Sequence, residues 1–274
     1  MGATLSATLS DSELDRYLEF ALHLGELAGR AILPHFRAPL EVANKSSDGG
    51  FDPVTIADRS AETAIRDEIA RVFPSHGVWG EEHGRTAGTS PFTWVIDPID
   101  GTRAFVLGLL QWGTLIALND GERPVLGVMT QPYVGELFIG SRRGAELRHG
   151  AETRALRTRR CPRLADASLA STSPAGFPSR SQRACFDLVA STVRQVRFGT
   201  DCYAYCMLAA GLIDLVIESR LNPYDIQAPI AIIEAAGGVV TSWTGGRADA
   251  GGAVIAAGDP ELHREALKIL SLAF

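Results

Sequence analysis

Six acidic residues stand where the chain is expected to change from one structural element to another, rather than along solvated helix faces. They are Asp58, Glu81, Glu82, Asp97, Asp100 and Asp225. Carboxylates at the mouths of buried strands repel one another unless a cation joins them. Ligation by oxygen alone favours magnesium, manganese or calcium over zinc. The sequence therefore predicts a site for a hard divalent cation.

The most informative segment begins with the apolar run at residues 94–96, which is typical of a buried strand. This strand would deliver Asp97 to its end. Pro98 forces an extended or turn conformation, so Asp97 and Asp100 can point into one space. The carbonyl of Ile99, between them, offers a further oxygen ligand.

Gly101 and Thr102 then open a new segment, whose backbone N–H groups could hold a phosphate while the Thr102 hydroxyl contacts a water. Taken alone, the run DPIDGT is explained as well by a type I turn with two Asx contacts. Here it is accompanied by Asp58, Glu81 and Asp225, and this combination favours the metal site over the turn.

Hydrophobic periodicity predicts the elements that must position these residues. A capped helix is expected at residues 11–33, a polar loop or hairpin tip at 45–52, a helix from 58 to 73, and a mostly antiparallel sheet at 78–147. Further helices are expected at 182–194, 203–211, 226–236 and 260–273, with strands at 213–217 and 237–243. Two α/β subdomains, residues 1–150 and 151–274, are predicted; the second supplies Asp225.

Charge and composition exclude several classes of partner. The net charge of the 274 residues is −6, which argues against a nucleic-acid surface because such surfaces need clustered Lys and Arg. The most basic stretch, residues 154–163, lacks aromatic residues and is better interpreted as a solvated connector. No apolar run approaches the roughly 20 residues of a membrane helix, and no signal segment is visible, so a cytoplasmic location is expected.

The four cysteines form no CxxC pair of the kind found in zinc sites. Cys202 and Cys206 are four residues apart, so we expect them on one face of a helix as small core residues.

The motifs DPVTIADRSAE, WGEEHG, WVIDPIDGTRAF and NPYDIQAPIAIIEAAGG occur in this order along the chain. Together they resemble the inositol monophosphatase superfamily over about residues 10 to 270. The resemblance implies an α/β (α+β) fold, a layered α/β/α/β/α sandwich, and usually a homodimer. It also implies a phosphatase for small-molecule phosphate esters that uses two or three Mg2+ ions.

The resemblance further assigns roles to individual residues. The first magnesium ion would be surrounded by Glu81, Asp97, the Ile99 carbonyl and Thr102. The second would be held by Asp97, Asp100 and Asp225. The attacking water would be activated by a catalytic set of Asp58, Thr102 and Glu81. Phosphate would be bound by Gly101 and Thr102, and the surroundings of the site would include Lys45 and Glu82.

The alcohol part of the substrate would contact several positions at which this chain carries other residues than the inositol phosphatases do. The resemblance places Asp201 and Glu218 in the leaving-group pocket, together with Asp100, Asp225 and Arg103. Two extra carboxylates suit a cationic amine, because the charge-assisted hydrogen bond would be lost with a neutral polyol. The runs GTRAF, GTLIAL, GTDCYAYC and NPYD resemble the histidinol-phosphatase branch, whose substrate carries such an amine.

Alternatives remain at this stage. Asp201 could also serve as a helix N-cap, and Arg103 could be a surface residue or a partner of Glu218. The substrate could be inositol-1-phosphate or a broad set of esters, whereas bisphosphate substrates would need a second basic site with no clear candidate. A non-catalytic binding protein of the same fold would be expected to lack a ligand, and all the expected ligands are present.

Overall fold

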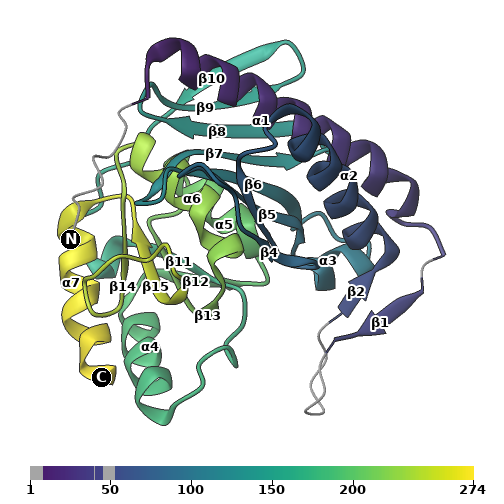
Figure 1. Cartoon of the computed structure of the whole chain (residues 1–274). Helices are drawn as coiled ribbons and strands as arrows, with labels where there is room; N and C mark the ends of the chain where they lie inside the picture. Colours follow the sequence, from purple (N-terminus) through teal and green to yellow (C-terminus); the bar gives the residue numbers. More distant parts are fainter. Residues whose placement is uncertain (1–8, 40, 46–52) are drawn as a thin grey trace.

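The computed structural model describes residues 9–39, 41–45 and 53–274, and within them the chain forms three β-sheets and seven α-helices (Figure 1). The largest sheet has eight strands in the order β10-β9-β8-β7-β6-β5-β3-β4 and is antiparallel except between β3 and β5. Its strands are β3 (Gly77–Gly80), β4 (Gly84–Thr86), β5 (Thr93–Asp100), β6 (Gly113–Asn119), β7 (Pro124–Gln131), β8 (Glu136–Ser141), β9 (Gly144–His149) and β10 (Glu152–Leu156).

The second sheet has five strands in the order β12-β11-β13-β15-β14, of which β12, β11 and β13 run parallel. They are β11 (Ser168–Ser171), β12 (Gln195–Phe198), β13 (Leu215–Leu221), β14 (Val239–Ser242) and β15 (Gly252–Ala257). A separate hairpin pairs β1 (Val42–Asn44) with β2 (Pro53–Thr55).

The helices and sheets alternate in five layers (Figure 1). Helices α1 (Asp11–Ile32) and α2 (Ile56–Val72) cover one face of the large sheet. Helices α5 (Asp201–Ala209) and α6 (Pro223–Ala235) lie between the two sheets, while α4 (Arg180–Thr192) and α7 (Pro260–Leu270) cover the outer face of the small sheet. The short α3 (Thr102–Val106) follows β5, and 3-10 turns occupy Leu33–His35, Leu164–Asp166 and Ser271–Ala273.

Three hydrophobic clusters fill the interfaces between these layers, and the middle one surrounds α5 and α6 and contacts both sheets. Strand β6 shows why one strand can serve two of them: Leu115 faces the cluster with α5 and α6, and Ile116 faces the cluster with α1 and α2. In the same way, Val216 and Ile217 of β13 face opposite clusters. The predicted layered α/β/α/β/α sandwich is thereby confirmed.

Two glycines of the large sheet allow α6 to approach it closely. A Cβ atom on Gly127 would lie 2.3 Å from the carbonyl oxygen of Ala228, and one on Gly140 would lie 2.3 Å from the Cα atom of Ile232. Side chains at these positions would push the helix off the sheet. The backbone contact therefore fixes α6, which carries Asp225 in its first turn.

Most predicted elements are confirmed, including the cap of the first helix, where Ser10 and Glu13 form a capping box. Several helix starts were predicted two or three residues late: α2 begins at Ile56, α4 at Arg180, α5 at Asp201 and α6 at Pro223. Asp225 therefore lies inside the first turn of α6 rather than before it. The expected loop at 45–52 lies outside the described residues except for Lys45, and the strands that flank it do pair as a hairpin.

The arginine-rich stretch is solvated as expected, since its five arginines are exposed, but it is not only a connector. Arg154 belongs to β10, and Arg159 forms a two-pronged ion pair with the buried Asp214, with N to O distances of 2.6 Å. Asp214 is fully buried while Arg159 stays 43% exposed, so the arginine neutralises a buried carboxylate from the surface. The proposed boundary at residue 150 stays a prediction; the chain passes from the large to the small sheet between Leu156 and Ser168.

No helix in the described part of the chain is long and apolar enough to cross a membrane.

A neutral histidine sits inside the aromatic cluster between α1 and the large sheet. The His76 side chain is 9% exposed, and its Nδ1 atom has no hydrogen-bond partner. Its ring stacks on that of Phe73 at 4.7 Å and contacts Tyr17, Phe92 and Trp94. Burial lowers the pKa of His76 from 6.5 to about 4, and the charge of Arg16 adds to the effect.

This histidine is expected to make the fold acid-sensitive. Below pH 6.5 this histidine binds a proton in the unfolded chain, whereas in the folded protein it stays neutral until about pH 4. The free energy of unfolding therefore falls as the pH drops through this window. His76 should contribute a loss of about 2 kcal/mol between pH 8 and pH 5. Urea unfolding of the wild type and of His76→Phe at both pH values measures this loss as the difference between the two proteins. The exposed His149→Phe serves as control, and equal pH dependence in all three proteins would contradict the expectation.

Candidate metal centre

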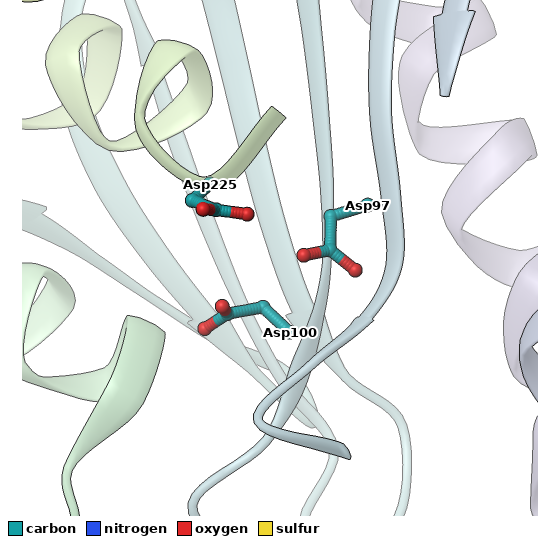
Figure 2. Close-up of side chains that lie close together, drawn as sticks. All are labelled: Asp97, Asp100 and Asp225. Atoms are coloured by element: carbon teal, nitrogen blue, oxygen red, sulfur yellow. The ribbon is translucent and has the colours of Figure 1, made fainter. Parts of the chain in front are cut away.

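Three of the predicted ligands meet between the large sheet and α6. The side chains of Asp97, Asp100 and Asp225 each place a carboxylate oxygen within 4.8 Å of the others. Figure 2 shows the three carboxylates pointing toward one another, two from the end of β5 and one from α6. Asp97 is 2% exposed. Residues 125 positions apart in the sequence therefore form one acidic cluster.

Local hydrogen bonds hold the end of β5 in an irregular conformation. The pairing of β5 with β6 shifts register between Asp97 and Asp100, which frees both side chains to point the same way. The Ile99 N–H donates to Asp97 Oδ1 at 3.0 Å, and the Thr102 hydroxyl donates to the Ile99 carbonyl at 3.0 Å. The Pro98 carbonyl accepts a hydrogen bond from Thr114 at 2.8 Å.

Gly101 is required by the same geometry. It has φ 86°, in the left-handed region that favours glycine. A Cβ atom here would lie 2.5 Å from the Gln111 carbonyl oxygen and 3.3 Å from the Cβ atom of Asp201. Gly101 therefore lets the predicted phosphate-binding turn pass directly beside Asp201.

Three helices direct their N-termini at the acidic residues. Asp58 Oδ2 accepts from the Thr55 N–H at 2.8 Å, and Asp225 Oδ2 accepts from the Asn222 N–H at 2.7 Å, each in the first turn of its own helix. Asp100 Oδ2 accepts from the N–H of Cys202 in the first turn of α5 at 2.6 Å. Helix N-termini carry partial positive charge, so they lower part of the cost of gathering carboxylates.

The remaining cost is visible in the pKa values. Burial raises the pKa of Asp97 and Asp100 well above the usual range, and the neighbouring carboxylates raise them further. Burial likewise raises the pKa of Asp225 to about 7, against the Asn222 N–H, which favours the charged form. The cluster thus holds more negative charge than its own hydrogen bonds neutralise.

The flanking acidic residues add to this charge. Glu81 and Asp58 lie outside the group of three, but Glu81 raises the pKa of both Asp97 and Asp58. Lys45 donates to Glu81 at 2.7 Å and to Glu82 at 2.9 Å. Burial opposes its charge, yet the two carboxylates raise the pKa of Lys45.

The donor set fits a hard divalent cation. All candidate ligands offer oxygen, and the predicted catalytic carboxylate beside them has an unsatisfied atom: Asp58 Oδ1 is buried without a hydrogen-bond partner. The joint catalytic role expected of Asp58 and Thr102 stays a prediction. In the structure Asp58 accepts a hydrogen bond from the Thr55 hydroxyl, and Thr102 donates to the Ile99 carbonyl.

Asp201, one of the residues predicted for the leaving-group pocket, lies beside the cluster. Asp201 opens α5 with φ 41°, and burial raises its pKa to about 6 although the charge of Arg103 lowers it. Its expected role as N-cap is not realised, since α5 has Thr200 at the cap position and no side-chain capping bond. Glu218, on β13, accepts from the Thr172 N–H at 2.6 Å and hydroxyl at 2.9 Å, and burial raises its pKa to about 8.

Comparison with known proteins shows to which family this fold and acidic cluster belong. Residues 13–272 match the model of the inositol monophosphatase family. The chain belongs to the inositol monophosphatase family. It is 40% identical to the bifunctional phosphatase IMPL2, chloroplastic, of Arabidopsis thaliana, over 96% of this chain and 77% of that protein. It is 36% identical to a histidinol-phosphatase of Streptomyces coelicolor, over 93% and 96%.

Solved structures of the family agree. An inositol monophosphatase of Zymomonas mobilis superposes with a TM-score of 0.83 at 38% identity, over 96% of this chain and all of the other. The chain is accordingly a phosphatase of the inositol monophosphatase family, whose candidate metal centre is the acidic cluster described above.

Two features of this family member were not predicted from the sequence. The N–H of Cys202 is bonded to Asp100, and a fully buried glutamate, Glu62, faces the turn that carries Glu81. Glu62 lies four residues after Asp58 and so on the same side of α2. The four-residue spacing from Asp58 could have indicated that Glu62 faces the site, whereas nothing in the local sequence indicates that the Cys202 N–H donates to Asp100.

Proposed function

We propose that the chain is a magnesium-dependent phosphomonoesterase that hydrolyses histidinol phosphate to histidinol and phosphate, a step of histidine biosynthesis. The observation that carries the metal-dependent chemistry is the meeting of Asp97, Asp100 and Asp225 beside the unsatisfied Asp58 Oδ1. Glu81, the Ile99 carbonyl and Thr102 would complete the ligand set for two or three Mg2+ ions. Bound magnesium supplies positive charge to the phosphate and lowers the pKa of an attacking water.

The chain's own residues would orient the reactants. Asp58 Oδ1 is free to accept a proton from the attacking water, because its other oxygen is already held by Thr55. Backbone N–H groups of Gly101 and Thr102 would hold phosphate oxygens at the turn. Lys45 would keep Glu81 in place through the ion pair described above.

Specificity for an amine-bearing ester rests on Asp201 more than on Glu218. With a pKa of about 8, Glu218 is mostly neutral at pH 7, and its carboxyl group already accepts two hydrogen bonds from Thr172. Asp201, with a pKa of about 6, is mostly charged at that pH and lies against Gly101. A cationic amine near the phosphate would therefore meet Asp201 first.

A second candidate substrate is inositol-1-phosphate, supported by the likeness to the Zymomonas inositol monophosphatase. The Streptomyces relative bears the name histidinol-phosphatase, which supports the first candidate. The predicted homodimer and cytoplasmic location remain part of the proposal.

A panel of phosphate esters decides between the candidates. We expect histidinol phosphate to give the highest kcat/KM in the presence of magnesium, ahead of inositol-1-phosphate, fructose bisphosphate and adenosine bisphosphate. Chelation of the metal should abolish turnover of every ester. Highest kcat/KM on inositol-1-phosphate would reject the amine-pocket argument, and turnover that survives chelation would reject the metal site itself.

A further inference from the structure

A buried glutamate on α2 contacts the turn between β3 and β4. The side chain of Glu62 is fully buried and accepts three hydrogen bonds. Two come from the backbone N–H groups of Glu82 at 2.6 Å and His83 at 3.1 Å. The third comes from Arg66 Nε at 2.7 Å, one helical turn further along α2. The carboxylate therefore grips the backbone of the residues directly after Glu81.

Arg66 adds further hydrogen bonds between α2 and the β3–β4 hairpin. Its guanidinium donates to the hydroxyl of Thr86 at 3.1 Å and to the carbonyl of Gly84. The planar fork can bind the glutamate and both hairpin groups at once, which a lysine cannot do. The pair formed by Glu62 and Arg66 thus ties α2 to the β3–β4 turn and to β4.

Two further contacts show how little freedom the turn has. A Cβ atom on Gly80 would lie 2.1 Å from Glu62 Oε1, so only glycine allows this approach. On the other side, the Glu81 N–H donates to the Ile96 carbonyl of β5 at 3.3 Å. The turn is held between the glutamate of α2 and the strand that delivers Asp97.

We infer that Glu62 is a positioning residue that fixes the Glu81–Glu82 turn relative to Asp58. The inference rests on the proposed metal-dependent function. One rigid helix carries Asp58 in its first turn and Glu62 one turn later, so any motion of α2 moves both Asp58 and Glu81 together. Groups that orient a metal ligand without touching the metal typically change metal affinity about 10- to 100-fold when they are removed.

The test compares two glutamates of the same helix. Glu62→Gln keeps the size of the side chain but leaves one acceptor oxygen for three donors. Glu68→Gln is the matched control, because Glu68 also pairs with an arginine, Arg71, and with His23, but it does not contact the hairpin. We expect Glu62→Gln to raise the magnesium concentration for half-maximal activity about 10- to 100-fold, while Glu68→Gln leaves it unchanged.

Activity at saturating magnesium separates positioning from loss of fold. A displaced ligand should be recovered by excess metal, so kcat of Glu62→Gln should return to within a few-fold of the wild type. A merely structural defect would lower activity equally at every metal concentration. Calorimetric titration with Mn2+ gives a readout that does not need turnover, and Arg66→Lys, a milder change in the same grip, should weaken Mn2+ binding in the same direction.

The outcomes are distinct. If Glu62→Gln binds Mn2+ as tightly as Glu68→Gln does, the inference is wrong even when the wild-type enzyme hydrolyses its ester. If the wild type binds Mn2+ but hydrolyses no phosphate ester, the proposed function fails, and the Mn2+ affinities of the variants still decide the role of Glu62.

Discussion

Asp97→Asn is expected to abolish the magnesium-dependent hydrolysis of every phosphate ester. Asp97 is buried at the centre of the acidic cluster and is the proposed ligand shared by both metal positions. Asparagine has the same shape and can keep the hydrogen bond from the Ile99 N–H, but it offers no charge to a cation. We expect kcat/KM to fall by at least ~10²–10³, which is the typical loss on removing one charge-stabilising group.

The same change should make the metal-free protein more stable. Because burial and the neighbouring carboxylates raise the pKa of Asp97, its charged form is unfavourable in the folded state at pH 7. Neutral asparagine removes this penalty, so Tm without metal should rise, whereas the rise in Tm on adding magnesium should shrink. Thermal unfolding with and without the ion measures both effects.

Asp120→Asn is the matched control. Asp120 follows β6 and accepts from the N–H groups of Glu122 and Arg123, so it has the turn role that was the alternative for DPIDGT. It stands at the far end of the sheet, because Thr93, at the start of β5, pairs with Asn119. Retained activity in Asp97→Asn, or equal loss in Asp120→Asn, would contradict the metal site.

The layered fold was predictable because its signals are local. Alternation in β6 and the 3.6-residue stripe of α1 each determine which side chains are buried, and those faces dictate the layers. Helix starts were less predictable. The caps of α2 and α6 are Thr55 and Asn222, three residues before an aspartate, and a capping box with Asp in the last position is easily read as a helix that begins later.

The site shows a similar division. The spacing of Asp97 and Asp100 after a strand was enough to predict that both point into one space, and the motifs brought in Asp225, which the structure places beside them. The groups that hold the site are tertiary contacts. The Cys202 N–H reaches Asp100, and Glu62 reaches the Glu82 N–H, only because α5 and α2 pack where they do. Every residue except proline has the same backbone N–H group, so the sequence does not indicate which of these groups contacts the site.

Asp201→Asn is expected to change which ester is preferred rather than whether esters are hydrolysed. Asparagine tolerates the positive φ of 41° at this position, which alanine does not, so the helix start should be preserved. A hydrogen bond to a charged group contributes roughly 1.5–3 kcal/mol, so the kcat/KM ratio of histidinol phosphate to inositol-1-phosphate should fall roughly 10- to 150-fold. Paired steady-state assays on the two esters measure this ratio.

Glu218→Gln supplies the comparison within the same pocket. With a pKa of about 8, Glu218 is mostly neutral at pH 7, and glutamine can still accept from Thr172. We therefore expect its kcat/KM ratio to change much less than that of Asp201→Asn. Because Asp201 also raises the pKa of Asp100, some effect common to both esters is expected in Asp201→Asn. Only the ratio reports amine recognition, and an unchanged ratio would show that Asp201 shapes the turn beside Gly101 without selecting the substrate.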